Sequence, residues 1–136
     1  MEDTLTFELV TPARLLVSEQ ASMVVMPGGE GDFGVLPGHA PLISTIRPGA
    51  LSIHKEGGEV LAYFVSGGFA EAGPERCALL AEEAVLVADI DIAKANTRLE
   101  EARAALGSAE DDLQRAAAEN KIAVNEAMIA TAEPGR

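Results

Sequence analysis

The chain changes character near residue 88, and this change limits the folds open to it more than any other feature. Before that point, short apolar runs alternate with turns rich in glycine and proline; after it, alanine dominates. Short runs at this spacing are typical of strands, whereas an alanine-rich segment has a high helix propensity. The sequence therefore predicts two domains, a strand-rich domain over residues 1–88 and a helical domain over residues 89–136.

The first domain is expected to be an antiparallel β-sandwich or flattened barrel. Leu5, Phe7 and Leu9 alternate with polar residues, as in a strand with one buried face. Gly57-Gly58 is typical of a hairpin turn, and Gly67-Gly68 ends another run. The connections are too short for parallel strands with crossover helices, which favours antiparallel pairing. Further strand-like runs cover residues 23–26, 42–46, 51–53, 60–65, 77–80 and 85–87.

The second domain is predicted to be an antiparallel pair of helices. The first helix carries a narrow apolar stripe. Gly107 is expected to end this helix, and Ser108, with Asp111 three residues later, is expected to begin the next one. The second helix is then expected over residues 109–132. The stripe consists of Ile92, Ala95, Leu99, Ala102 and Leu106.

The apolar stripes of this hairpin are mostly alanine. Each alanine removes less apolar surface from water than a leucine or phenylalanine would, so the contact is weak. Such a hairpin could open and dock elsewhere. A partner or ligand can shift the equilibrium between two packings whose free energies differ by a few kcal/mol. The alternative is that it packs permanently on the sandwich, and composition leaves both possibilities open.

The charge and cysteine content exclude several classes of protein. With 22 acidic against 10 basic residues the net charge is −12, which repels nucleic acid and anionic lipid. The single cysteine, Cys77, forms no internal disulfide, and the first residues do not resemble a signal peptide. No apolar run approaches the roughly 20 residues of a membrane span. We expect a cytosolic protein without lipid insertion, held at any membrane by another protein.

The residues needed for catalysis or metal binding do not occur together in the sequence. The glycines of the segment 28–34 are interrupted by Glu30 and Asp32, which disfavours a phosphate site. His39 and His54 lack the spacing of metal ligands, and Cys77 is expected in the core. We therefore predict no catalytic residues, no metal and no cofactor.

The loop around His39 is the best candidate for recognition. Pro37 and Pro41 restrict the backbone on both sides of His39, and Gly38 precedes it. A rigid loop loses little entropy on binding, which suits a protein contact. The same residues could merely turn the chain between strands, and the local sequence does not decide between the two.

Several blocks of the sequence, spread over nearly the whole chain, together resemble one family, the epsilon subunit of the F-type ATP synthase. GHAPL followed by SGGF at this spacing is specific, although each alone is weak. The blocks are VTPARLL (10–16), GEGDFGVLPGHAPL (29–42), RPGAL (47–51), VSGGFAE (65–71), ALLAEEA (78–84) and DIDIAKA (89–95).

The resemblance implies a non-catalytic subunit at the foot of the rotating central stalk, on the cytoplasmic face of the bacterial inner membrane. It implies coupling of proton-driven rotation of the c-subunit ring to ATP synthesis in the alpha/beta hexamer. By matching position, Glu30, Gly31 and Asp32 would face the c ring. His39, Ala40 and Pro41 would lie on or near the contact with the gamma subunit.

The expected second helix departs from the pattern of relatives whose hairpin inhibits ATP hydrolysis. In those relatives a basic second helix faces an acidic segment of the beta subunit. Here only Arg115 and Lys121 are basic, and like charges would meet. We therefore expect weak or absent inhibition and only a possible contact with the alpha/beta hexamer. The acids of this segment are Glu110, Asp111, Asp112, Glu119 and Glu126.

Some relatives bind ATP through an I-D-x-x-R-A motif at the start of the first helix. Residues 90–95 match it, with Asp91 in place and Lys94 where the motif has arginine. Lysine keeps the charge but lacks the planar pair of donors. The substitution weakens the case for a nucleotide site at Asp91 and Lys94.

Two other classes of function are distinguishable from a rotor subunit. One is a stand-alone regulatory sandwich that senses a small ligand through its hairpin. The other is a hydrolase or transferase, which would need a nucleophile, base or metal cluster that the sequence does not contain.

Overall fold

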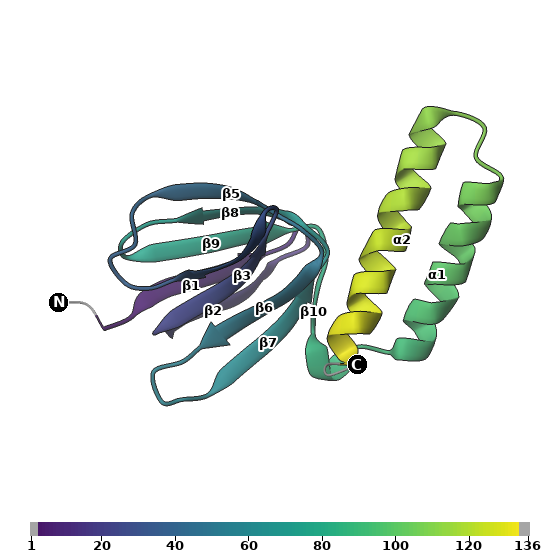
Figure 1. The fold of residues 1–136 in the computed structure, drawn as a ribbon. Helices are drawn as coiled ribbons and strands as arrows, with labels where there is room; N and C mark the ends of the chain where they lie inside the picture. The colour runs from purple at the N-terminus through teal and green to yellow at the C-terminus, as the bar shows by residue number, and fades with distance from the viewer. Residues whose placement is uncertain (1–2, 134–136) are drawn as a thin grey trace. The chain divides into compact units, whose positions relative to one another are not determined.

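The computed structural model describes residues 3–133 of the chain, which form two compact units divided between Leu86 and Val87 (Figure 1). Strands make up the first unit and helices the second, which confirms the predicted fold class. The division lies two residues before the expected boundary. The strands are β1 Leu5–Val10, β2 Leu15–Ala21, β3 Met23–Gly28, β4 Gly31–Val35, β5 Leu42–Ile46, β6 Gly49–His54, β7 Val60–Val65, β8 Gly68–Ala72, β9 Arg76–Ala81 and β10 Ala84–Leu86.

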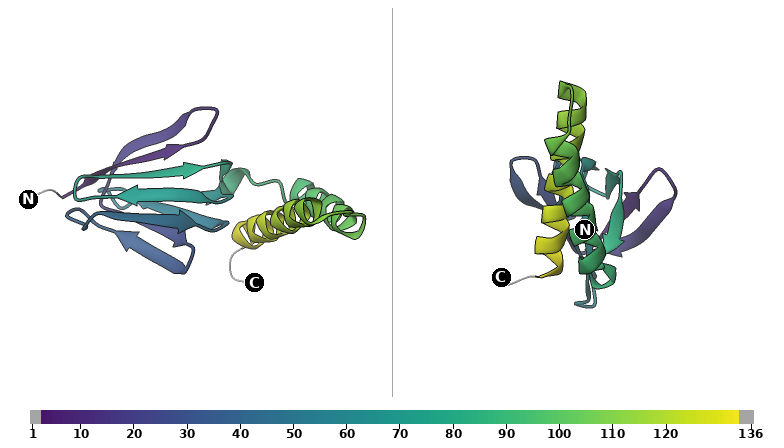
Figure 2. Two further views of the ribbon diagram at one scale, coloured as in Figure 1. Left: turned by 90° about the horizontal axis from the view of Figure 1, so that it is seen from above. Right: turned by 90° about the vertical axis from the view of Figure 1, so that its right-hand side faces the viewer.

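The strands curl around a shared interior instead of lying in one flat layer (Figures 1 and 2). Their hydrogen-bonded order is β10-β7-β6-β3-β5-β8-β9-β1-β2, and β4 pairs with β3 beside this path. The pairs are antiparallel except β1 with β9, which run parallel. The expectation of purely antiparallel pairing was therefore wrong at this one junction. β1 pairs with β9, which lies some 70 residues later in the chain, and no local sequence pattern predicts such a pair.

The core follows the period-2 alternation of the strands. Leu5, Phe7 and Leu9 are almost completely buried, as their alternation with polar residues predicted. Leu51 and Ile53 do the same on β6, while the intervening Ser52 is only partly buried. Burying side chains of this size contributes about 1.5–3 kcal/mol each. The sandwich is thus held by a row of inward residues from each strand.

The open edge of the sheet at β2 carries a charge that faces the inner side. Glu19 lies directly opposite the buried Phe7, so its side chain shares the inner face of the sheet. Its Oε1 lies 3.1 Å from Nζ of Lys55, just after β6, and Glu19 raises the pKa of Lys55. Close by, the backbone N–H and hydroxyl of Ser22 both donate to the carbonyl of His54, at 2.7 and 3.0 Å. These contacts hold the β2–β3 corner against the end of β6.

The helical unit begins with a short 3-10 turn, η1 Val87–Asp89, followed by α1 Ile92–Gly107 and α2 Asp112–Ala132. Each helix starts at an aspartate. Asp91 Oδ1 accepts the backbone N–H of Lys94 at 3.0 Å, and Asp111 Oδ1 accepts that of Gln114 at 2.7 Å. The buried side chains are Ala95, Leu99 and Ala102 of α1, and Ala118, Asn125 and Met128 of α2.

The predicted start of the second helix was wrong by three residues. Ser108 ends α1 instead of beginning α2, since its hydroxyl donates back to the carbonyl of Ala104 at 3.2 Å. The backbone N–H of Ser108 also donates to the carbonyl of Ala104 at 3.2 Å, and its hydroxyl lies 3.4 Å from the carbonyl of Ala105, so Ser108 supplies donors to carbonyls of the last helical turn. The carboxylate of Asp111 then takes the N-cap position that the sequence analysis gave to Ser108.

Three strands were missed in the sequence: β2, β4 and β8. Of these, β4 contains two glycines, Gly31 and Gly34, and β2 ends in polar residues, so neither shows a β-rich run. The third, β8, begins at Gly68, which was taken as the end of the preceding run. The last strand is also one residue earlier than expected, because Val87 belongs to η1.

Gly68 is the glycine whose replacement we expect to damage the sandwich most. Its φ is +145°, and a Cβ there would lie 1.9 Å from the carbonyl oxygen of Leu80 on the neighbouring β9. Gly68→Ala should lower the free energy of unfolding of the strand-rich unit by about 3 kcal/mol through strain and overlap. Urea unfolding followed by the fluorescence of Tyr63, the only tyrosine, measures this.

The control for this prediction is Gly57→Ala in the β6–β7 turn, where no heavy atom lies within 4 Å of the added Cβ. That variant should stay within about 1 kcal/mol of the parent chain. Equal unfolding midpoints for the two variants would contradict the packing described for Gly68.

Candidate functional site

An exposed apolar row crosses the outer face of the sandwich. Phe69 of β8 lies opposite Leu80 of β9, Leu80 lies opposite Val10 of β1, and Val10 lies opposite Leu15 of β2. Opposite residues share a face, and the β1–β2 register shifts by one residue between Leu9 and Val10, where Leu15 becomes the exposed partner of Val10. The four side chains are here called the outer row. Phe69 is 61% exposed, Leu15 52% and Leu80 50%, while Val10 is half-buried.

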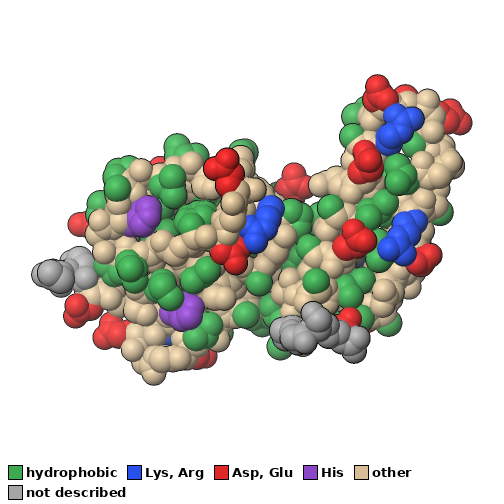
Figure 3. Space-filling model, viewed as in Figure 1, with side chains coloured by type: hydrophobic (Ala, Val, Ile, Leu, Met, Phe, Trp, Pro, Cys, Tyr) green, Lys and Arg blue, Asp and Glu red, His purple; other side chains and the backbone are tan. Residues whose placement is uncertain are grey.

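The residues of the outer row alternate along their strands with residues of the core. Ala70, Leu79 and Leu9 are the neighbours of Phe69, Leu80 and Val10 along the chain, and all three are buried. On β5, Ile43 extends the apolar surface and is 76% exposed. Hydrophobic side chains reach the surface over much of this unit (Figure 3). Contiguous apolar surface of this kind marks a contact with another macromolecule more often than it marks a monomer's exterior.

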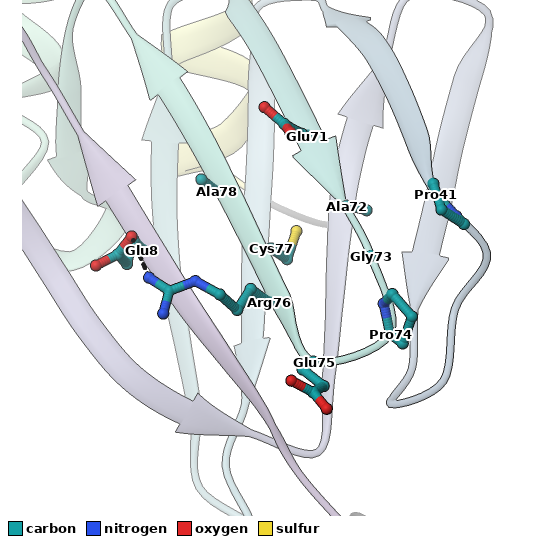
Figure 4. Close-up of a pocket in the computed structure, with 10 residues that line it drawn as sticks. All are labelled: Glu8, Pro41, Glu71, Ala72, Gly73, Pro74, Glu75, Arg76, Cys77 and Ala78. Atoms are coloured by element: carbon teal, nitrogen blue, oxygen red, sulfur yellow. Dashed lines mark hydrogen bonds and ion pairs between the residues drawn. The ribbon is translucent and has the colours of Figure 1, made fainter.

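A shallow hollow of about 590 Å³ lies on the same strands (Figure 4). Glu71 of β8 lies opposite Ala78 of β9, and Ala78 lies opposite Glu8 of β1, whose Oε1 is 3.2 Å from a guanidinium nitrogen of Arg76. Ala78 is therefore a small side chain between two longer ones in this hollow. Its other lining residues are Pro41, Ala72, Gly73, Pro74, Glu75 and Cys77.

This hollow offers no evident chemistry. Cys77 is 2% exposed, and burial raises the pKa of its thiol to about 12, so the thiol stays neutral and unreactive. Within residues 3–133, no three histidine, cysteine, aspartate or glutamate side chains gather as a metal site. The exposed apolar side chains of this face are suited to contact with another macromolecule.

The loop with His39, Ala40 and Pro41 borders the hollow. The N–H of Gly38 donates to the carbonyl of Pro74 at 2.8 Å, which ties the loop to the β8–β9 turn. Within the loop the N–H of His39 donates to the carbonyl of Leu36 at 3.1 Å, and Gly38 takes a φ of +86°. The loop is therefore held in one shape beside the face. Pro41 lines the hollow, so one of the three residues that the sequence placed near the gamma contact lies at this face.

Glu30, Gly31 and Asp32 form the turn between β3 and β4 and the first residues of β4, and all three are exposed. Asp32 is bound, since its Oδ1 lies 2.5 Å from a guanidinium nitrogen of Arg47. The other terminal nitrogen of Arg47 donates to the carbonyl of Gly28 at 2.5 Å. Arg47 thus fastens the acidic turn through Asp32, whereas no ion pair is found for Glu30 within the described residues.

This acidic turn lies next to β5, where a second hollow of about 530 Å³ brings it beside Ile43 and Thr45. The N–H of Gly29 also donates to the carbonyl of Thr45 at 2.9 Å. Since Thr45 lies opposite Phe69, the turn is close to the end of the outer row. The acidic turn and the His39 loop therefore both lie near the apolar face, although they are separate in the sequence.

Asp91 and Lys94 lie in the helical unit. The carboxylate of Asp91 caps α1 by accepting the backbone N–H of Lys94, so its role in the structure is to begin the helix. The expectation that Lys94, in place of arginine, weakens a nucleotide site here stays a prediction from the sequence.

Phe69, Leu80 and Leu15 were not predicted from the sequence as exposed residues of one face. Phe69 and Leu15 lie on strands that the sequence analysis did not identify. The signal was present in β8, where Phe69, Ala70, Glu71 and Ala72 alternate between exposed and buried positions. Such an alternation is the mark of a half-buried strand.

The family model of the ATP synthase Delta/Epsilon chain beta-sandwich domain matches residues 4–87. The chain belongs to the ATP synthase epsilon chain family. The ATP synthase epsilon chain of Paramagnetospirillum magneticum is 48% identical over 130 residues, which cover 96% of this chain and 98% of that one. That of Rhodospirillum rubrum is 45% identical, with 96% and 97% covered. The chain is accordingly a subunit of an ATP synthase.

Two solved assemblies contain similar chains. One is the Euglena gracilis mitochondrial ATP synthase OSCP/F1/c-ring, where the TM-score is 0.81 at 30% identity, with 96% of this chain and 82% of that chain covered. The other is the Tetrahymena thermophila mitochondrial ATP synthase central stalk and c ring, with a TM-score of 0.66 and 94% and 96% covered. At 12% identity, the second shows a shared fold only.

Among residues 3–133, no helix combines the length and the apolar character that crossing a bilayer requires.

Proposed function

We propose that this epsilon-family chain is a rotor subunit of the central stalk, which helps couple rotation of the c ring to ATP synthesis in the catalytic head. In this proposal the sandwich binds the gamma subunit through the outer row and rests on the c ring through the acidic turn. It carries out no catalysis itself. The exposed apolar face supports the proposal most directly, because a subunit that transmits torque needs a rigid surface that another subunit covers.

The contact with gamma is assigned to the outer row and the His39 loop. Phe69, Leu80 and Leu15 supply apolar surface on strands, whose backbone is already ordered. His39, Ala40 and Pro41 add a loop that is tied to the β8–β9 turn. Because little conformational freedom remains to be lost, most of the burial contributes to affinity. The same features favour a protein partner over the small ligand of a stand-alone sensor.

The contact with the c ring is assigned to Glu30, Gly31 and Asp32. Asp32 is engaged by Arg47, so Glu30 is the carboxylate available to a basic group on the ring. Exposed ion pairs contribute only about 0–1 kcal/mol each. The acidic turn therefore orients the subunit on the ring, while shape and apolar contact provide the holding force.

The hairpin is proposed to inhibit ATP hydrolysis weakly or not at all. One of the two basic residues of α2, Arg115, is already paired with Asp112 at 2.6 Å. Glu126 of α2 likewise lies 3.6 Å from Arg103 of α1. Over residues 109–132 five acidic residues stand against two basic ones, which opposes docking on an acidic segment of the beta subunit. Any contact of the hairpin with the alpha/beta hexamer would then be weak.

The location follows from these partners. The chain would be peripheral to the bacterial inner membrane, on its cytoplasmic face, and held there through gamma and the c ring. The negative charge of −12 opposes direct binding to anionic lipid.

Phe69→Ser should weaken binding to the gamma subunit by about tenfold or more, because a central aromatic side chain carries a large share of contact energy. Titration of the full-length chain with immobilised gamma measures the Kd. Val60→Ser is the matched control, since Val60 is 50% exposed but lies on β7, outside the outer row. Unchanged affinity for both Phe69→Ser and Leu80→Ser would remove the outer row from the gamma contact.

Glu30→Lys should weaken association with the c ring several-fold at low salt, and the difference should shrink at high salt because the charge is exposed. Pull-down by reconstituted c ring at two ionic strengths measures this. Glu56→Lys in the β6–β7 turn makes the same charge change elsewhere on the unit. If the two variants behave alike, the acidic turn does not face basic groups of the ring.

Deletion of the residues after Val87 should change ATP hydrolysis by the intact enzyme by less than about twofold, since like charges oppose the docking of α2. The control is an enzyme whose full-length chain carries Glu110→Lys and Glu119→Lys. We expect this charge-reversed enzyme to hydrolyse ATP more slowly than the enzyme with the deletion. A several-fold rise on deletion from the unmodified enzyme would show that the hairpin inhibits despite its charge.

A further inference from the structure

Asn125 of α2 is the one polar or charged side chain that is buried in the part of the chain that the structure describes. It is 6% exposed and lies among the buried residues of the helix pair. Its Nδ2 donates to the carbonyl of Lys121, one turn earlier in the same helix, at 2.8 Å. Its Oδ1 is shielded from solvent and has no hydrogen-bond partner. Buried polar atoms in folded proteins nearly always have one.

The single bond that Asn125 makes adds little. In an α-helix the carbonyl of residue 121 already accepts the backbone N–H of residue 125, so Nδ2 shares an occupied acceptor. The other polar atom of the amide, Oδ1, is an acceptor that is shielded from water and has no donor. An unpaired buried acceptor destabilises the state that buries it, while exposure to water removes the penalty.

The surroundings of Asn125 do little to offset this penalty. The facing helix, α1, contributes Ala95, Leu99 and Ala102 to the buried surface, none of which has a side-chain donor. Two of the three are alanine, as is Ala118 of α2, so the apolar area that pairing removes from water is small. The helix pair therefore combines a weak favourable term with a specific unfavourable one.

We propose that Asn125 is a built-in destabilising element of the α1–α2 pair, which keeps the equilibrium between paired and separated helices poised. When the helices separate, Oδ1 gains hydrogen bonds from water; when they pair, it loses them. The residue thus favours separation, and an apolar side chain at this position would favour the paired form. This proposal concerns the hairpin alone and does not depend on the assignment of the chain as a rotor subunit.

A buried asparagine can also act in the opposite sense, by fixing the register of two helices through a bond across the interface. That role needs a polar partner on the facing helix. The described hydrogen bond of Asn125 goes to its own helix and not to α1. The geometry therefore points to destabilisation and not to register.

The test compares Asn125→Leu with Asn120→Leu in the full-length chain by amide hydrogen exchange. Leucine has the same number and branching of side-chain heavy atoms as asparagine, and it replaces the amide with larger methyl groups, which add apolar contact. Asn120 is exposed on the same helix, so its variant reproduces the change in helix propensity without the interface. Exchange of α1 and α2 amides should be about tenfold slower in Asn125→Leu than in Asn120→Leu. Unchanged exchange in the strands verifies that the sandwich is intact.

Exchange in Asn125→Leu that equals or exceeds that of Asn120→Leu would overturn the proposal. A second pair, Asn125→Ala and Asn120→Ala, separates the missing hydrogen bond from added apolar contact. Removing Oδ1 without adding surface should leave exchange in Asn125→Ala no faster than in Asn120→Ala. Faster exchange there would mean that Asn125 supports the helix pair through its contacts, and that result would also overturn the proposal.

Discussion

The parallel pairing of β1 with β9 is the contact on which the rest of the strand-rich unit depends. It joins the β1–β2 pair to the other strands, because β2 is hydrogen-bonded to β1 at the end of the sheet order. Its register also sets both faces at once. Leu9 meets Leu79 in the core, and one residue later Val10 meets Leu80 on the outside. A slip by a single residue would turn the core outward and break the outer row.

The core and the exposed apolar face both result from the alternation of inward and outward side chains along the same strands. The inward residues provide the stability that keeps the strands rigid, and rigidity in turn allows a modest apolar surface to serve as a firm contact. The additions at the rim are local. Arg47 fastens the acidic turn beside β5, and the bond from Gly38 to Pro74 fastens the His39 loop beside the hollow. The helical unit differs in kind, because its buried residues are mostly small and include the unpaired carbonyl of Asn125.

Features that depend on residues close together in the chain were predicted from the sequence, and features that depend on distant residues were not. Leu5, Phe7 and Leu9 were predicted correctly because strand alternation is a local pattern, and the apolar stripe of α1 contains the three residues that are buried in the structure. The parallel pair could not be predicted, since it joins residues far apart in the chain. Phe69 was overlooked because two glycines before it suggested a strand end. Asn125 was overlooked because its importance depends on what faces it, and single-residue composition does not contain that information. The acidic turn and the His39 loop were predicted from the sequence as contact segments, and their proximity to the apolar face became visible only through β5 and the β8–β9 turn.

The inward charge of Glu19 on the edge strand β2 has a consequence for the chain before it meets its partners. An edge strand presents unpaired N–H and C=O groups, which are a template for the strands of other molecules. If such a strand docked on β2 and drew it into a continuous sheet, Glu19 would be carried with it, away from Lys55, towards an apolar interior. An inward-facing charge on an edge strand therefore opposes edge-to-edge pairing of this chain with another strand.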